Sequence, residues 1–216
     1  MRLFHRFTQG ELRLTRIEAF SDGIFAVAVT LLVLDLKVPA LHDPTDVREL
    51  AQALLEQLPR FLSWLISFII VCKFWLNHHH LLGLARHADY GFVWLNSIFL
   101  MGQSFIPFPT AMVGEYHGNA LAVSFFGGVF ALNTLLFMAL QAYVVSRLIK
   151  PELVALQDPH ALRKAFLGPL CYLIGAAAAW VYIPAAFVVY ALTPLLYITP
   201  PQGPKKARSQ SRTMKR

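Results

Sequence analysis

Residues 16–37 combine an ionisable side chain with an apolar run long enough to cross a membrane. They read RIEAFSDGIFAVAVTLLVLDLK, with Asp22 six residues after Arg16. A carboxylate inside a membrane span is costly, and it usually faces protein or water. Two interpretations stay open. Asp22 either stabilises the positive end of the helix dipole, or it belongs to a polar network or a water-lined path.

An apolar stripe follows in the same segment. Val27, Leu31 and Leu34 have the spacing i, i+4, i+7, which puts them on one face of a helix. Thr30 lies beside this stripe, and Asp35 follows near its far end. Such a stripe can contact lipid or the protein core. It can also form a hydrophobic constriction that closes a pore by excluding water.

The sequence KFWLNHHHLLGLARHAD, which begins at Lys73, holds a second group of polar residues. Lys73 and Trp75 are expected to anchor a helix end at the membrane interface. Consecutive histidines lie about 100° apart around a helix, so the run that begins with His78 and His79 cannot bind one metal ion together. We expect these histidines and the later Asn96 to form hydrogen bonds between helices.

Motifs for metal binding and catalysis are missing from the sequence. The zinc pattern HExxH does not occur, and neither does a nucleophile–base, nucleotide-binding or carbonyl-filter motif. We therefore predict no metal site, no catalytic residue, no enzymatic activity and no cofactor.

Membrane-spanning helices must position these residues. Of the 216 residues, 56% are hydrophobic and 14% are charged, whereas soluble domains have about 25% charged residues. Pro184 marks a tight hairpin, and Pro107 with Pro109 breaks or kinks a helix, because the proline ring blocks helix continuation. A span needs about 20 apolar residues. We predict an all-α membrane protein whose domain, residues 17–199, has six transmembrane helices, approximately 17–36, 58–77, 91–113, 120–146, 164–180 and 184–199.

Basic residues set the predicted orientation. With six spans, one side holds the N-terminal segment 1–16, the loops after the second and fourth spans, and the basic tail 200–216. The opposite side holds an acidic loop after the first span, residues 38–57. The positive-inside rule therefore predicts that both termini are cytoplasmic. We expect the tail to be disordered and to meet membrane lipid rather than nucleic acid. Cys72 and Cys171 imply no disulfide framework.

Several of these motifs resemble a known family. RIEAFSDGIFAVAVTLL is similar to the Arg-x-x-x-Phe-Ser-Asp signature that opens the first helix of the transmembrane protein 175 family of potassium channels. FWLNHHH, WLNSIFL and PFPTAMVGEY resemble segments of its bacterial members, over most of residues 13–200. The resemblance implies a homotetramer of six-helix chains, with a pore lined by the first helix and an apolar constriction in place of a carbonyl filter.

The resemblance also implies roles for individual residues. The constriction positions fall on Val27, Leu31 and Leu34, and the threonine linked to potassium preference falls on Thr30. Val27 occupies a position that often carries Ile or Leu, which implies a wider neck and weaker potassium preference. A polar network is implied for the signature residues, together with groups of the second and third helices: Arg16, Phe20, Ser21 and Asp22, with His78 or His79, and Asn96.

We therefore expect a passive channel that prefers potassium over sodium, in a bacterial inner membrane, with potassium as the permeant ion. The alternative is a proton-coupled secondary transporter in which Asp22 and a histidine of the second helix relay protons. No inverted repeat is evident, and no charge is expected in mid-membrane, which favours the channel.

Overall fold

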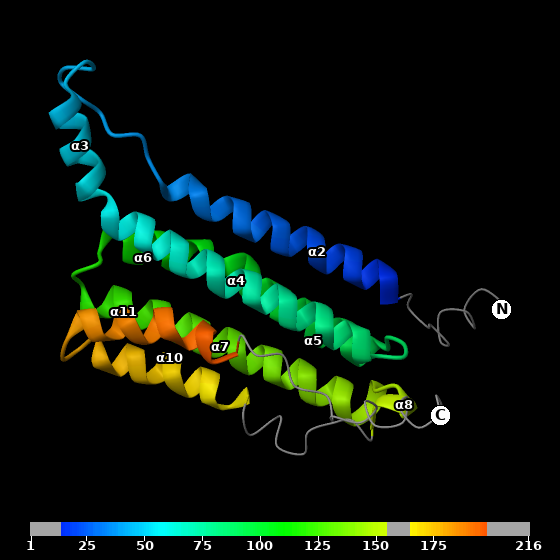
Figure 1. Cartoon of the computed structure of the whole chain (residues 1–216). Coiled ribbons are helices and arrows are strands. Elements are labelled where there is room, and N and C mark those ends of the chain that lie inside the picture. The colour runs from blue at the N-terminus through cyan, green and yellow to red at the C-terminus, as the bar shows by residue number, and fades with distance from the viewer. Residues whose placement is uncertain (1–13, 155–164, 198–216) are drawn as a thin grey trace, which may run out of the picture.

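The computed structural model describes residues 14–154 and 165–197, and within them the chain is nearly all helical (Figure 1). The predicted N-terminal segment lies mostly, and the predicted basic tail wholly, outside the described residues. The elements are α2 (Leu14–Leu31), η1 (Leu32–Asp35), α3 (Val47–Glu56), α4 (Leu58–Leu84), α5 (Tyr90–Phe105), α6 (Pro107–Glu115), α7 (Ala120–Tyr143), η2 (Val144–Leu148), α8 (Pro151–Val154), α10 (Leu167–Ala178), α11 (Ile183–Leu192) and η3 (Thr193–Tyr197).

Within the described residues, four stretches are long and apolar enough to cross a membrane. They are Leu14–Asp35, Leu58–Leu84, Tyr90–Glu115 and Ala120–Leu148. The last two predicted spans correspond to α10 and α11, which have 12 and 10 residues, fewer than the about 20 that a straight crossing needs. The count of six spans and the orientation of the termini therefore stay predictions.

The long helices run side by side, with α2 along one edge and the α10–α11 hairpin along the opposite edge (Figure 1). Aromatic rings from four helices meet in the centre. The Phe99 ring centroid on α5 lies 6.1 Å from that of Phe25 on α2, 5.9 Å from that of Phe74 on α4, and 5.5 Å from that of Phe137 on α7. These separations are typical of favourable edge and tilted ring contacts. One cluster thus ties α2 to the rest of the bundle.

Prolines interrupt the helices where the sequence predicts. α5 ends at Phe105 and α6 begins at Pro107, because a proline nitrogen cannot donate to the preceding turn. Pro184 is the second residue of α11. The turn before it, residues 179–182, reverses the chain between α10 and α11, so the predicted hairpin is confirmed.

One side chain, Tyr190, anchors the hairpin to α7. Tyr190 is fully buried, and its hydroxyl donates to the Val123 carbonyl oxygen at 3.0 Å. Its ring lies against Gly127, where a β-carbon would come 2.7 Å from Tyr190 Cζ, and against Gly175, where a β-carbon would come closer still to Tyr190 Cε1. Contacts of that length are not tolerated, so both positions need glycine for the helices to close around the ring.

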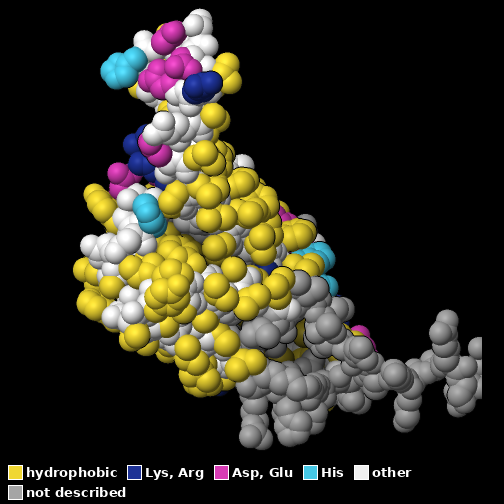
Figure 2. Space-filling view, turned by 60° about the vertical axis from the view of Figure 1, so that its left-hand side comes forward, with side chains coloured by type: hydrophobic (Ala, Val, Ile, Leu, Met, Phe, Trp, Pro, Cys, Tyr) yellow, Lys and Arg dark blue, Asp and Glu magenta, His cyan; other side chains and the backbone are white. Residues whose placement is uncertain are grey.

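The acidic loop predicted over residues 38–57 contains a helix, α3. Asp46 caps its N-terminus, accepting the backbone N–H of the second helical residue at 2.7 Å and that of the third residue, Glu49, at 3.3 Å. In the turn before it, hydrogen bonds from the Thr45 backbone N–H and hydroxyl hold the pKa of the Asp43 carboxyl below its usual value. Figure 2 shows this end of the molecule carrying charged side chains above a broad hydrophobic surface.

Candidate functional site

The two faces of α2 have opposite environments. Ser21, Phe25, Ala28 and Leu32 are buried against the bundle, each with at most 2% of its surface exposed. Their spacing of four, three and four residues follows one helical face. This face packs on α4 and α5, and it fixes how α2 is rotated about its own axis.

The predicted constriction residues lie on the other face. Val27 is 56% exposed, Leu31 42% and Leu34 71% in the single chain. Phe20, at 59%, continues the same face toward the start of the helix. We call Val27, Leu31 and Leu34 the exposed stripe. An apolar stripe that its own chain does not cover is available to lipid or to another copy of the protein.

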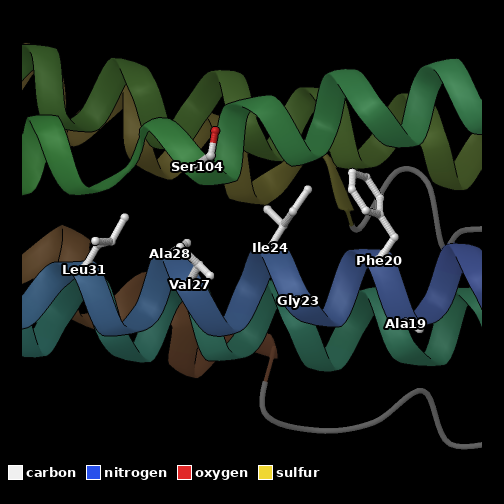
Figure 3. A pocket seen from close by; sticks show the side chains of 8 residues that line it. All are labelled: Ala19, Phe20, Gly23, Ile24, Val27, Ala28, Leu31 and Ser104. Atoms are coloured by element: carbon white, nitrogen blue, oxygen red, sulfur yellow. The ribbon is translucent and has the colours of Figure 1, made fainter.

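A groove runs along the edge of this face, between α2 and α5 (Figure 3). Its volume is about 480 Å³. Ser104 is the polar side chain in its lining, and the Ser104 hydroxyl already donates to the Met101 carbonyl oxygen at 2.8 Å. The surroundings are suited to excluding water rather than to holding an ion. The groove is lined by Ala19, Phe20, Gly23, Ile24, Val27, Ala28, Leu31 and Ser104.

Thr30 lies at the border of the exposed face. Its hydroxyl is 2.9 Å from the Ala26 carbonyl oxygen and 3.0 Å from that of Val27, so its proton is engaged within the helix. The hydroxyl oxygen keeps lone pairs that can accept a hydrogen bond or contact a cation.

A buried chain of hydrogen bonds crosses three helices. The Asn96 amide on α5 donates to Ser21 Oγ on α2 at 3.1 Å, and its oxygen lies 2.7 Å from His78 Nε2 on α4. Because an amide oxygen can only accept, His78 Nε2 carries the hydrogen in this arrangement. Ser21 donates in turn to the Ile17 carbonyl oxygen at 2.8 Å. We call Ser21, Asn96 and His78 the polar chain. Of the two histidines that the sequence left open, His78 is the one joined to Asn96.

Asp22 belongs to a separate, more exposed cluster on the seam between α2 and α4. Its carboxylate accepts the Trp75 indole N–H at 2.8 Å. The Trp75 ring stacks on His79 with centroids 6.0 Å apart, and His79 Nδ1 lies 3.5 Å from a Glu18 carboxylate oxygen. Of the other predicted network residues, Arg16 is exposed and Phe20 lines the groove.

Glu18 and Trp75 were not predicted from the sequence to belong to this cluster. Glu18 and Trp75 each lie four residues from a predicted partner on the same helix, Asp22 and His79, and this spacing was the available signal. Lys73 and Trp75 were expected at a helix end, which was wrong, because α4 continues to Leu84. The Lys73 ammonium donates to the Pro194 carbonyl oxygen at 3.0 Å.

Within the described ranges, no group of three His, Cys, Asp or Glu side chains is arranged to hold a metal ion. The exposed stripe is apolar, with Thr30 at its border, whereas the polar chain lies on the opposite face of α2 and the Asp22 cluster lies between α2 and α4. This separation provides an apolar surface on one side of α2 and a hydrogen-bonded anchor on the other.

Comparisons with known proteins show that the chain is similar to channels. The family model described as the endosomal/lysosomal potassium channel TMEM175 matches residues 16–107. A potassium channel of Chamaesiphon minutus is 37% identical over 187 residues, covering 81% of this chain and 90% of that protein. A potassium channel of Streptomyces collinus is 34% identical over 189 residues, covering 84% and 90%. The human endosomal/lysosomal proton channel TMEM175 is 41% identical over 90 residues, covering 39% of this chain and 18% of the human protein.

The fold comparison gives the same family. The crystal structure of a lysosomal potassium-selective channel TMEM175 homolog from Chamaesiphon minutus superposes with a TM-score of 0.72 at 32% identity, covering 85% of this chain and 95% of that one. The predicted resemblance is confirmed. With its four long apolar spans, this chain is a multi-pass membrane protein, and it belongs to the TMEM175 channel family.

Proposed function

We propose that the protein is a passive cation channel that prefers potassium, formed by four copies of the chain around an axis lined by α2. The observation that carries the proposal is the exposed stripe. Its side chains are apolar and uncovered, while the polar chain holds the opposite face of the same helix in the bundle. The potassium channels among its relatives support the same activity.

Four exposed stripes facing one axis would make a narrow apolar neck. Val27, Leu31 and Leu34 would then form three successive rings, and such rings control conduction by excluding water until the neck is wide enough. Thr30 would place a hydroxyl oxygen beside the neck. An ion that loses part of its water there could be partly solvated by this oxygen, and potassium yields its water more readily than sodium.

The proposed placement in the membrane follows from charge. Six spans with both termini in the cytoplasm put the segment 1–16, the loop that contains Arg86 and the tail 200–216 on the positive side. The domain 17–199 would form the channel in a bacterial inner membrane. α3 and its acidic neighbours would then face the outside.

Reconstitution in liposomes tests the proposal. With a potassium gradient as the sole driving force, a potassium-preferring channel generates a membrane potential close to the potassium Nernst value and needs no coupled solute. Replacing external sodium by an impermeant cation should change this potential little. A potential absent from vesicles that contain the assembled protein would contradict the proposal.

A second candidate is proton permeation or proton-coupled transport. The observation that favours it is the seam cluster, in which Asp22, His79 and Glu18 are titratable and partly exposed. The human relative, named a proton channel, supports it. In the same liposomes, a potential that follows an imposed pH gradient, and that Asp22→Asn or His79→Gln abolishes, would establish this candidate.

A further inference from the structure

The outer end of α2 continues into η1, a short 3₁₀ helix that carries Leu34 and Asp35. Leu34 points away from the bundle, and Asp35 is half-buried. A 3₁₀ turn has poorer hydrogen-bond geometry than an α-helix and is used in short pieces. The lateral position of Leu34 therefore depends on the contacts between η1 and the helices of the bundle.

α6 supplies that support at Gly114, which is buried. A β-carbon added there would lie 3.0 Å from Ser63 Oγ and 3.2 Å from both Arg60 Cγ and Asp35 Oδ2. These separations are shorter than ordinary van der Waals contacts. Three side chains from η1 and α4 therefore converge on a point that a glycine of α6 leaves free.

An ion pair lies immediately beside this point. The Arg60 guanidinium of α4 contacts the Glu115 carboxylate of α6, the residue after Gly114. Their side chains are 24% and 50% exposed, and ion pairs at such exposure add little to folding stability. Their effect is geometric, since the pair fixes the last turn of α6 over the first turn of α4.

We infer that Asp35, Arg60, Gly114 and Glu115 form an outer clamp that sets the position of Leu34. The inference rests on the proposed function, because it gives Leu34 the outermost ring of the constriction. The clamp residues are positioning residues. α2 is then held twice, by the polar chain in its inner half and by the clamp at its outer end, with Val27 and Leu31 between the two.

The test compares two glycine substitutions in reconstituted, full-length protein. Gly114→Ala adds a methyl group inside the clamp, whereas Gly128→Ala adds one on α7 where nothing lies within 4 Å. Leu34→Cys and Val27→Cys report on the two ends of the stripe, in a background with Cys72→Ser and Cys171→Ser. The readouts are the rate of modification by a water-soluble thiol reagent and the potassium-to-sodium permeability ratio.

Gly114→Ala should change the modification rate at Leu34→Cys by about threefold or more and shift the permeability ratio, while the rate at Val27→Cys stays within about twofold. Gly128→Ala should change neither. The double variant Arg60→Gln with Glu115→Gln should reproduce the effect, and it serves as the test if Gly114→Ala fails to assemble. Light scattering after size exclusion shows that each variant retains the wild-type oligomer.

The outcomes separate the two claims. A wild-type protein that assembles but conducts no cations overturns the proposed function. Wild-type conduction with an unchanged Leu34→Cys rate in both clamp variants overturns the clamp alone. A changed rate without a shift in permeability ratio supports the clamp and overturns the placement of Leu34 in the constriction, because Leu34 would then move without affecting the neck.

Discussion

The Thr30 hydroxyl is bonded within α2, yet its oxygen faces the exposed side of the helix. Thr30→Ala should keep the channel open and bring the potassium and sodium permeabilities closer together. The reason is that alanine removes the oxygen that can replace water around a partly dehydrated ion. Reversal potentials under bi-ionic potassium and sodium measure the change.

Thr30→Ser is the matched control. Serine keeps the hydroxyl and can donate to the same carbonyl oxygens of Ala26 and Val27. Wild-type selectivity in both variants would mean that the Thr30 oxygen serves only the helix.

Leu31 lies in the middle of the exposed stripe. Leu31→Ala should increase cation leak in the resting channel and lower the preference for potassium, because smaller rings admit water more easily. Flux into liposomes and bi-ionic potentials would show both effects. Val33→Ala is a suitable comparison, since Val33 is exposed on η1 but lies outside the stripe, and it should leave both quantities close to wild type.

At the level of single residues, spacing alone predicted which side chains share a face, but not their partners. The stripe follows from i, i+4, i+7 periodicity, and the structure places its three members together on the exposed face. The choice between His78 and His79 could not be made from sequence. Neighbouring residues lie about 100° apart, and only the position of α5 shows which of them meets Asn96.

Among the elements, α2 depends on the polar chain for its rotation. Asn96→Ala leaves the His78 ring without its partner and removes the hydrogen bond that Ser21 Oγ accepts, while the Ser21 hydroxyl keeps its bond to the Ile17 carbonyl oxygen. An unpaired buried group costs about 1–3 kcal/mol. Interhelical hydrogen bonds within membranes average about 0.6 kcal/mol, so the lower end of that range is expected. Thermal loss of the oligomer in detergent, followed by size exclusion, measures the destabilisation.

Ser97→Ala is the control on the same helix. The Ser97 hydroxyl donates to the Val93 carbonyl oxygen within α5 at 2.8 Å and forms no hydrogen bond to another of the described helices. Equal thermal stability of the two variants would show that the polar chain does not hold α2.

The stability of α3 depends strongly on its N-terminal cap, Asp46. The large apolar side chains of α3 are exposed, and none of its residues is buried, so tertiary packing adds little to its stability. Asp46→Ala should therefore destabilise the helix by about 0.5–2 kcal/mol and speed backbone hydrogen exchange over residues 47–56. Asp46→Asn keeps a good capping residue and should exchange like wild type. Unchanged exchange in Asp46→Ala would mean that contacts outside the chain hold α3.

The long helices could be predicted because about 20 consecutive apolar residues leave few alternatives in lipid. α3 was missed because its ten residues are fewer than the about 20 that mark a span, and because the turn-forming residues Asp43, Pro44 and Thr45 precede it. The pattern of Asp46 followed three residues later by Glu49 was the available signal. α4 runs seven residues beyond its predicted end at Asn77, since the polar run that begins there does not stop a helix.

At the scale of the whole molecule, the α10–α11 hairpin joins the bundle through a close fit at Tyr190. Gly127→Ala puts a methyl group against the Tyr190 ring and hydroxyl, and overpacking of this kind costs about 1–3 kcal/mol. We expect a lower melting temperature of the purified protein, measured by intrinsic fluorescence in detergent.

The neighbouring glycine provides the control. Gly128→Ala meets nothing within 4 Å and should melt close to wild type. Adding Tyr190→Phe to Gly127→Ala removes the hydroxyl oxygen, which is the atom nearest to the added methyl group, and should restore part of the lost melting temperature. If Gly127→Ala and Gly128→Ala melt alike, the fit at Tyr190 does not hold the hairpin.

The same fit has a consequence for how the protein is made. α10 and α11 leave the ribosome after the four long helices, and the Gly127 notch that receives Tyr190 is a feature of α7. The Val123 carbonyl oxygen that accepts the Tyr190 hydroxyl is on α7 as well. α7 must therefore be inserted in the correct orientation before the C-terminal hairpin can dock. Docking of Tyr190 is then a late step in biogenesis, and it can occur only when the earlier helices are in place.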